Sequence, residues 1–309
     1  MHRPKDFIQT AEGLLFAVVA ANTEAGKIRC FLRYAPVDGC YRKVASAEAN
    51  QFLAAHHPQY LFFSTQLDVN LHAVAEKDIV RHYQPQPVLQ QLLANDSAAD
   101  QVLADLHLLC RYLQLDGFDC RQLGITGSLL LGLQNPASDI DLVCYDRAVF
   151  QQLRRHVQAL IAQSKCHDLN DHDWLEAYKR RDCALTLDDY IWHEQRKYNK
   201  AIIQQRKFDL SLVVGTPLIN PQASKKLGFI HIETQVKDDT LGFDYPAELA
   251  IKHPEISSII CFTATYAGQA QTGEWIEVAG QLEVDAAGIK RIVVGSNREA
   301  AGEFIKVLR

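Results

Sequence analysis

Four residues within one short segment have side chains and spacing suited to phosphate chemistry. The segment from residue 123 to residue 144 reads LGITGSLLLGLQNPASDIDLVC, in which Gly127 and Ser128 precede Asp139 and Asp141. Side chains alternate between the faces of a β-strand, so the two aspartates should point the same way while the residues between and after them enter the core. Carboxylates held this close repel each other unless a divalent cation lies between them. The segment therefore predicts metal-assisted phosphate chemistry.

The Gly-Ser pair has the features of a phosphate-binding turn. Thr126, Gly127 and Ser128 follow a short run typical of a strand and precede SLLLGL, which favours a helix. Backbone N–H groups at the start of a helix bind anions. Glycine lets a phosphate approach the backbone closely, and the Ser128 hydroxyl adds a donor. A nucleophilic role for Ser128 is disfavoured, because the second glycine of a nucleophile elbow is missing.

This arrangement resembles the signature of the DNA polymerase beta type nucleotidyltransferase superfamily, a Gly-Ser pair followed after about ten residues by Asp-x-Asp. The family pattern requires a third carboxylate on a later strand, and Asp209 in the run RKFDLSLVVG is the candidate. The resemblance implies two Mg²⁺ ions, or Mn²⁺ in their place, bound by Asp139, Asp141 and Asp209. It also implies a nucleoside triphosphate such as ATP, held by Gly127 and Ser128, whose nucleoside monophosphate passes to a hydroxyl acceptor as pyrophosphate leaves.

A weaker resemblance covers nearly the whole chain. The segments DFIQTAEGLLFAVV, FLRYAP, GITGS, SDIDLV, RKYNKAI, WIEVAGQLEV and RIVVGS together are similar to a family of predicted nucleotidyltransferases that is common in archaea and occurs in some bacteria. This resemblance supports the assignment of the core and leaves open whether the acceptor is RNA, protein or a small molecule.

A group of basic residues lies shortly before the third aspartate. Arg196, Lys197 and Lys200 would neutralise a triphosphate or the departing pyrophosphate if they faced the aspartates, and we assign Arg196 and Lys197 to nucleotide binding. The alternative is a solvated helix face on which Glu194 pairs with nearby cations.

The run KCHDLNDHDW, residues 165 to 174, collects histidines and aspartates without a recognisable metal-site spacing. It lacks the glycine of a calcium loop and the HExxH pattern of a zinc helix. We interpret it as a polar loop that caps a helix beginning near Trp174.

Composition indicates a globular protein of more than one domain. The chain has 309 residues, 48% of them hydrophobic, and a net charge of -5, so the protein as a whole is not built to attract nucleic acid. Its eight cysteines include no CxxC pair and favour a reducing compartment. The first residues turn polar at once, which predicts neither a signal peptide nor a membrane span and makes the cytoplasm the expected location.

The elements that must position the aspartates follow from hydrophobic periodicity. A hairpin is expected from the runs DFIQTAEGLLFAVVA and KIRCFLRYAP, followed by a helix over 46–56 and a linker near Pro85 and Pro87. Helical spacing predicts one helix over 96–115, before the Gly-Ser strand, and another over RAVFQQLRRHVQALIAQ, after the aspartates.

The chain changes character beyond Thr216. The runs GFIHIETQV, ISSIICFTATY, EWIEVAGQLEV and IKRIVVGS favour a small antiparallel barrel or sandwich, with an OB-like barrel as one option, and the closing REAAGEFIKVL favours a short helix. Such a barrel would bind RNA through Lys290, Arg291 and Arg298 with Trp275 as a stacking surface. In the alternative, Trp275 is a core residue and the basic side chains are solvated.

The sequence therefore predicts an α+β protein in three parts: an N-terminal α/β module over residues 1–90, a nucleotidyltransferase-like mixed sheet with helices over 91–216, and a barrel-like domain over 217–309. The function that fits is transfer of a nucleoside monophosphate by a magnesium enzyme. A non-catalytic nucleotide- or RNA-binding protein on the same fold is the alternative.

Overall fold

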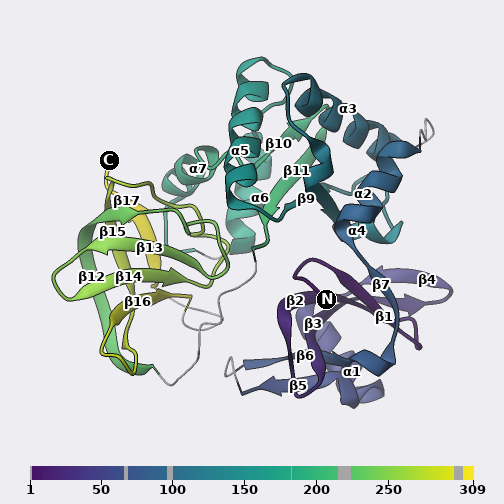
Figure 1. Ribbon diagram of the computed structural model, residues 1–309, viewed down its shortest axis with the longest axis horizontal. Helices are drawn as coiled ribbons and strands as arrows, with labels where there is room; N and C mark the ends of the chain where they lie inside the picture. The colour runs from purple at the N-terminus through teal and green to yellow at the C-terminus, as the bar shows by residue number, and fades with distance from the viewer. Residues whose placement is uncertain (1, 66–68, 96–99, 182, 215–223, 296–301) are drawn as a thin grey trace. The chain divides into compact units, whose positions relative to one another are not determined.

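The computed structural model describes residues 2–65, 69–95, 100–181, 183–214, 224–295 and 302–309 (Figure 1). The chain packs into two compact units, Met1–Cys166 with Ile202–Asn220, and His167–Ala201 with Pro221–Arg309. This division groups the N-terminal module with the mixed sheet and joins residues 167–201 to the C-terminal part, whereas the sequence suggested three consecutive parts.

A seven-stranded sheet occupies the N-terminal part of the first unit, with strand order β5-β6-β3-β2-β1-β7 and β4 paired to β3. Helix α1 (Ser46–His56) covers it, burying Ala49 and Leu53 against Phe16 and Leu32. The expected hairpin is confirmed for the second and third strands, and the first predicted run divides into two strands. The strands are β1 (Phe7–Thr10), β2 (Leu15–Glu24), β3 (Lys27–Val37), β4 (Cys40–Lys43), β5 (Leu61–Ser64), β6 (Val69–Ala75) and β7 (Ile79–Tyr83); the short helices η1 (Pro58–Tyr60) and η2 (Glu76–Asp78) connect some of them.

A mixed four-stranded sheet with order β10-β11-β9-β8 completes the first unit. Strand β9 is parallel to β11 and antiparallel to β8. Helix α5 contacts β9, α3 contacts α5, and α2 contacts β8. The elements are α2 (Pro85–Ala94), α3 (Gln101–Leu115), η3 (Cys120–Gln122), β8 (Leu123–Thr126), α4 (Gly127–Leu131), β9 (Ile140–Cys144), α5 (Arg147–Ala162), β10 (Lys200–Ile203) and β11 (Arg206–Leu212).

Helix α2 corrects the expectation of a linker at Pro85 and Pro87. Both prolines fall in the first turn of this helix, where the backbone N–H groups have no partner within the helix and proline costs little. The helix expected over 96–115 begins at Gln101, because the Asp100 carboxylate caps it by accepting from Val102 N at 2.8 Å. Residues 96–99 lie outside the described residues.

A closed barrel of five strands forms most of the second unit. Strand β12 pairs with both β13 and β15, which closes the order β12-β13-β14-β16-β15, and β17 adds to β15. The barrel confirms the coarse prediction, although β14 and β16 run parallel. Its strands are β12 (Lys225–Asp238), β13 (Ala247–Lys252), β14 (Ile256–Cys261), β15 (Trp275–Val284), β16 (Lys290–Val294) and β17 (Phe304–Val307), preceded by α6 (Asp171–Arg181) and α7 (Leu187–Gln195).

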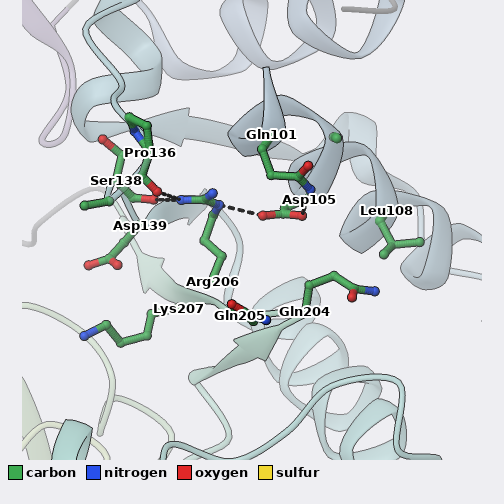
Figure 2. Close-up of a pocket in the computed structure, with 12 residues that line it drawn as sticks. Gln101, Asp105, Leu108, Pro136, Ser138, Asp139, Gln204, Gln205, Arg206 and Lys207 are labelled. Atoms are coloured by element: carbon green, nitrogen blue, oxygen red, sulfur yellow. Dashed lines mark hydrogen bonds and ion pairs between the residues drawn. The ribbon is translucent and has the colours of Figure 1, made fainter. Parts of the chain in front are cut away.

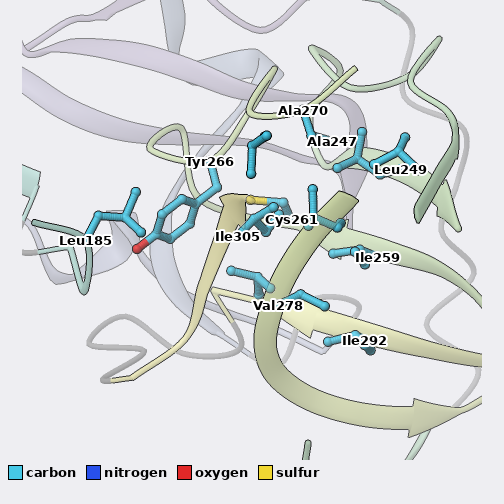
Figure 3. Close-up of a cluster of buried hydrophobic side chains, with 14 of the residues drawn as sticks. Leu185, Ala247, Leu249, Ile259, Cys261, Tyr266, Ala270, Val278, Ile292 and Ile305 are labelled. Atoms are coloured by element: carbon cyan, nitrogen blue, oxygen red, sulfur yellow. The ribbon is translucent and has the colours of Figure 1, made fainter. Parts of the chain in front are cut away.

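The barrel interior is continuous with a hydrophobic cluster that includes residues of the two helices. Leu185, just before α7, lies beside the ring of Tyr266, and both belong to the cluster that contains Cys261 and Ile305 of the barrel (Figure 3). The closing helix expected over REAAGEFIKVL is wrong for Phe304–Val307, which form β17, because alternate side chains enter the barrel core. Residues 296–301 are outside the described part. In the described residues, no helix is long and apolar enough to cross a membrane.

Candidate active site

The two strands of the mixed sheet bring the third predicted carboxylate beside the first pair. Strands β9 and β11 are parallel, and Asp209 is the register partner of Asp141. Asp139 immediately precedes β9. The residues alternating with the aspartates, Phe208 and Ile140, are buried, which fixes the register because a shift by one residue would turn the carboxylates inward. Asp139 and Asp209 are exposed, and Asp141 is half-buried.

The carboxylates also influence each other electrostatically. Burial, together with the charges of Asp209 and Asp139, raises the pKa of Asp141 to about 6, against the opposite effect of Lys5 and Lys43. The site therefore concentrates negative charge on oxygen atoms, which is the donor chemistry that fits Mg²⁺. Within the part of the chain that the structure describes, no three His, Cys, Asp or Glu side chains are already grouped around one metal position.

The Gly-Ser turn lies directly beside Asp141, because Thr126 at the end of β8 is the register partner of that aspartate. Gly127 has φ +68°, in the left-handed region. A Cβ at this position would overlap the carboxylate oxygen Oδ2 of Asp141 and lie 3.4 Å from its Cγ. Gly127 thus makes room for Asp141 as well as for a ligand.

The helix after this turn is shorter than the sequence suggests. Helix α4 has five residues and ends at Gly132 in the left-handed conformation. A helix of one turn has little macrodipole, so only the N–H groups of the turn and the half-buried Ser128 hydroxyl remain as candidate phosphate contacts.

The N-terminal sheet contacts this turn, which the sequence did not predict. The Thr126 hydroxyl donates to the Lys5 backbone oxygen at 2.8 Å. Phe7, Leu15 and Tyr34 from the N-terminal sheet form one hydrophobic cluster with Leu130 of α4. Nothing in the local pattern around Lys5 or Lys43 points to a site, because their proximity to Asp141 arises from packing between segments far apart in sequence.

An open depression of about 670 Å³ borders the site at Asp139. Arg206 is one of its lining residues and lies between Asp105 on α3 and the loop before β9 (Figure 2). The Arg206 Nε donates to the Asp105 Oδ2 at 2.8 Å, and Nη1 donates to the carbonyls of Pro136 at 3.0 Å and Ser138 at 2.5 Å. This buried ion pair holds the loop that leads to Asp139.

The remaining predicted nucleotide ligands are engaged elsewhere. Lys197 is 2% exposed, and its Nζ donates to Glu194 Oε1 at 2.5 Å and to the Thr265 carbonyl at 2.8 Å. Arg196 pairs with Glu274 and lies over the Trp192 ring, 4.4 Å from its centre. These partners belong to the second unit. The pairing of Glu194 with nearby cations agrees with the alternative, whereas the solvated helix face does not, because Lys197 is buried.

The ion pairs with Lys197 and Lys200 lower the pKa of Glu194. Burial alone would raise its pKa, yet Lys197 and Lys200 lower it to about 2. A phosphate bound by Lys197 would have to break a buried ion pair, which makes the predicted nucleotide contact energetically unfavourable.

Two other predictions have clear outcomes. The run 165–174 caps a helix, as expected, because Asn170 Oδ1 accepts from Asp173 N at 2.9 Å. The helix α6 begins at Asp171 and not near Trp174, so the last four residues of the run are helical and Trp174 is buried. Trp275 is 54% exposed on β15 and is therefore no core residue. Lys290 pairs with Glu255, and Arg298 lies outside the described residues.

One relative matches this chain over nearly its whole length. The chain is 34% identical to the uncharacterized protein MJ1086 of Methanocaldococcus jannaschii over 337 aligned positions, which cover 99% of each chain. No protein-family model matches the chain. No solved structure matches it either.

Proposed function

Because the chain belongs to the same family as the archaeal protein MJ1086, whose name states no activity, we propose a function from the site itself: a Mg²⁺-dependent nucleotidyltransferase. The reaction would transfer a nucleoside monophosphate from a nucleoside triphosphate, ATP among the candidates, to a hydroxyl acceptor and release pyrophosphate.

One observation carries the proposal: the parallel register that places Asp209 beside Asp141. A sequence that only resembled the motif by chance would have no reason to bring a third aspartate from a strand far along the chain to the same point. Together with the four-stranded mixed sheet, this geometry supports a nucleotidyltransferase-like core.

Each residue of the site has a defined task in this proposal. Asp139, Asp141 and Asp209 hold the Mg²⁺ ions, or Mn²⁺ in their place. Bound divalent ions neutralise phosphate charge and make an acceptor hydroxyl more acidic. Gly127 leaves space for the Asp141 carboxylate, and Ser128 donates its hydroxyl to a phosphate oxygen. The buried Arg206 pair keeps the loop before Asp139 in place.

The acceptor is RNA, protein or a small molecule, and the C-terminal barrel is the candidate for binding it. Its closed five-strand order with one parallel pair supports an OB-like barrel. The exposed indole of Trp275 supports stacking on a base. The eight free cysteines, six of them buried, suit a reducing compartment such as the cytoplasm.

The alternative is a non-catalytic nucleotide- or RNA-binding protein on the same fold, which the exposed indole of Trp275 also fits. Titration calorimetry with ATP and Mg²⁺ measures binding, and incorporation of labelled nucleotide into total RNA, protein and small metabolites measures turnover. Incorporation that is lost in Asp139→Ala and Asp141→Ala supports the enzyme. Binding without incorporation into any acceptor class would favour the alternative.

A further inference from the structure

Two exposed lysines come from the N-terminal part of the first unit, which packs against the Gly-Ser turn and α4. Lys5 precedes β1, and Lys43 is the last residue of β4. Both side chains are exposed and therefore accessible to a ligand. They have no place in the motif that defines the site, and they come from a different sheet of the same compact unit.

Lys5 is fixed next to the Gly-Ser turn by its backbone. Its carbonyl accepts the hydrogen bond from Thr126, the residue that pairs with Asp141 and precedes Gly127. Its N–H donates to the Val18 carbonyl at 3.0 Å, and its φ of +75° lies in the left-handed region that non-glycine residues rarely adopt. The surrounding hydrogen bonds must hold this strained conformation.

The docking of the N-terminal segment has a second anchor. The guanidinium of Arg3 lies over the ring of Tyr145, 5.3 Å from its centre, and Tyr145 directly follows β9. Contacts on both sides of the site, at Thr126 and at Tyr145, hold the segment that carries Lys5 against the mixed sheet.

Lys43 reaches the same region through Tyr34. The two residues are register partners on β4 and β3, and Tyr34 packs in the cluster that contains Leu130 of α4. Register partners on neighbouring strands carry their side chains on the same face of a sheet, so Lys43 lies on the face of β4 that corresponds to the packed face of Tyr34.

We propose that Lys5 and Lys43 form the cationic half of the binding site for the triphosphate, facing the three aspartates across the Gly-Ser turn. This inference rests on the proposed function, and it assigns to the N-terminal sheet the role that the sequence suggested for Arg196 and Lys197. A triphosphate carries more negative charge than the Mg²⁺ ions between it and three carboxylates can neutralise, so additional cations stabilise the bound anion.

The test measures the dissociation constant of inorganic tripolyphosphate for the full chain in the presence of Mg²⁺, by titration calorimetry. Lys5→Gln and Lys43→Gln should each raise the dissociation constant by about tenfold, the loss expected for one charge-assisted contact. Lys77→Gln, an exposed lysine in η2 of the same unit, is the matched control and should leave the constant unchanged. Lys5→Arg and Lys43→Arg keep the charge and should retain the affinity.

The inference is overturned if wild-type protein does not bind tripolyphosphate, if the Gln variants bind like Lys77→Gln, or if the Arg variants lose as much affinity as the Gln variants. Unfolding of Lys5→Gln is checked by its urea midpoint, and the Thr126 contact should survive because it uses the Lys5 backbone. Failure of nucleotide incorporation with every acceptor would reject the enzymatic function without altering this binding comparison. If the protein incorporates nucleotide and its affinity for tripolyphosphate is the same in Lys5→Gln and Lys43→Gln as in the wild type, this inference is rejected and the proposed function stands.

Discussion

Replacing Gly127 by alanine should greatly reduce turnover while reducing the stability of the fold only slightly. The added Cβ would overlap Oδ2 of Asp141, and the carboxylate would have to move by about 1 Å to regain van der Waals distance. Alanine at φ +68° also costs about 1 kcal/mol of stability. A displacement of this size at a reacting centre reduces turnover on the order of a hundredfold.

Gly132 provides a matched control for this substitution. Its φ is +67°, and nothing lies within 4 Å of a Cβ added there, so Gly132→Ala has the same backbone cost without the overlap. Mg²⁺-dependent pyrophosphate release and urea unfolding are measured for both variants. We expect similar losses of stability and a loss of turnover in Gly127→Ala alone. Equal turnover in the two variants would refute the role of Gly127 in placing Asp141.

Three further predictions concern stability. Arg206→Ala removes the cationic partner of the buried Asp105 carboxylate and should lower the free energy of unfolding in urea by about 3–5 kcal/mol. Arg121→Ala, in an exposed ion pair, should have no measurable effect, and equal losses in the two variants would contradict this prediction. Lys197→Gln should lower the unfolding midpoint and leave the apparent affinity for nucleotide unchanged, and the reverse result would restore its role as a phosphate ligand. Burial lowers the pKa of His72 and His193 to about 4 from 6.5, so the unfolded state binds more protons between these values and stability falls as pH drops. From pH 7.5 to 5 each histidine should cost about 2 kcal/mol, and a slope unchanged by His72→Gln would exclude this origin.

The sequence predicts which residues form the site better than it predicts which distant segments pack against them. The family resemblance requires a third carboxylate on a later strand, and the alternation around Asp209 predicts that its side chain points away from the buried face. The pairing of β11 with β9 is long-range, and only the structure shows that Asp209 and Asp141 are neighbours. For the same reason, no local pattern around Lys5 or Lys43 indicates their proximity to the aspartates.

The wrong predictions have local explanations. Pro85 and Pro87 predict a break in the chain, yet proline is compatible with the first turn of a helix. Phe304–Val307 follow residues with helical composition, and the open side of β15 decides that they form a strand. The nucleotide contact of Lys197 stays a prediction: its charge is visible in the sequence, whereas its burial against Glu194 depends on the fold.

The central claim is that Asp209, placed beside Asp141 by the register of β9 and β11, takes part in the reaction. The variant Asp209→Asn tests this claim most directly. This variant keeps the shape of the side chain and removes one charge from the group of three carboxylates. Pyrophosphate release at saturating Mg²⁺ should fall by at least about a hundredfold, while Asp188→Asn, an exposed aspartate in the first turn of α7, should retain wild-type turnover. Wild-type turnover in Asp209→Asn would contradict the account, because the third carboxylate would then have no part in the reaction.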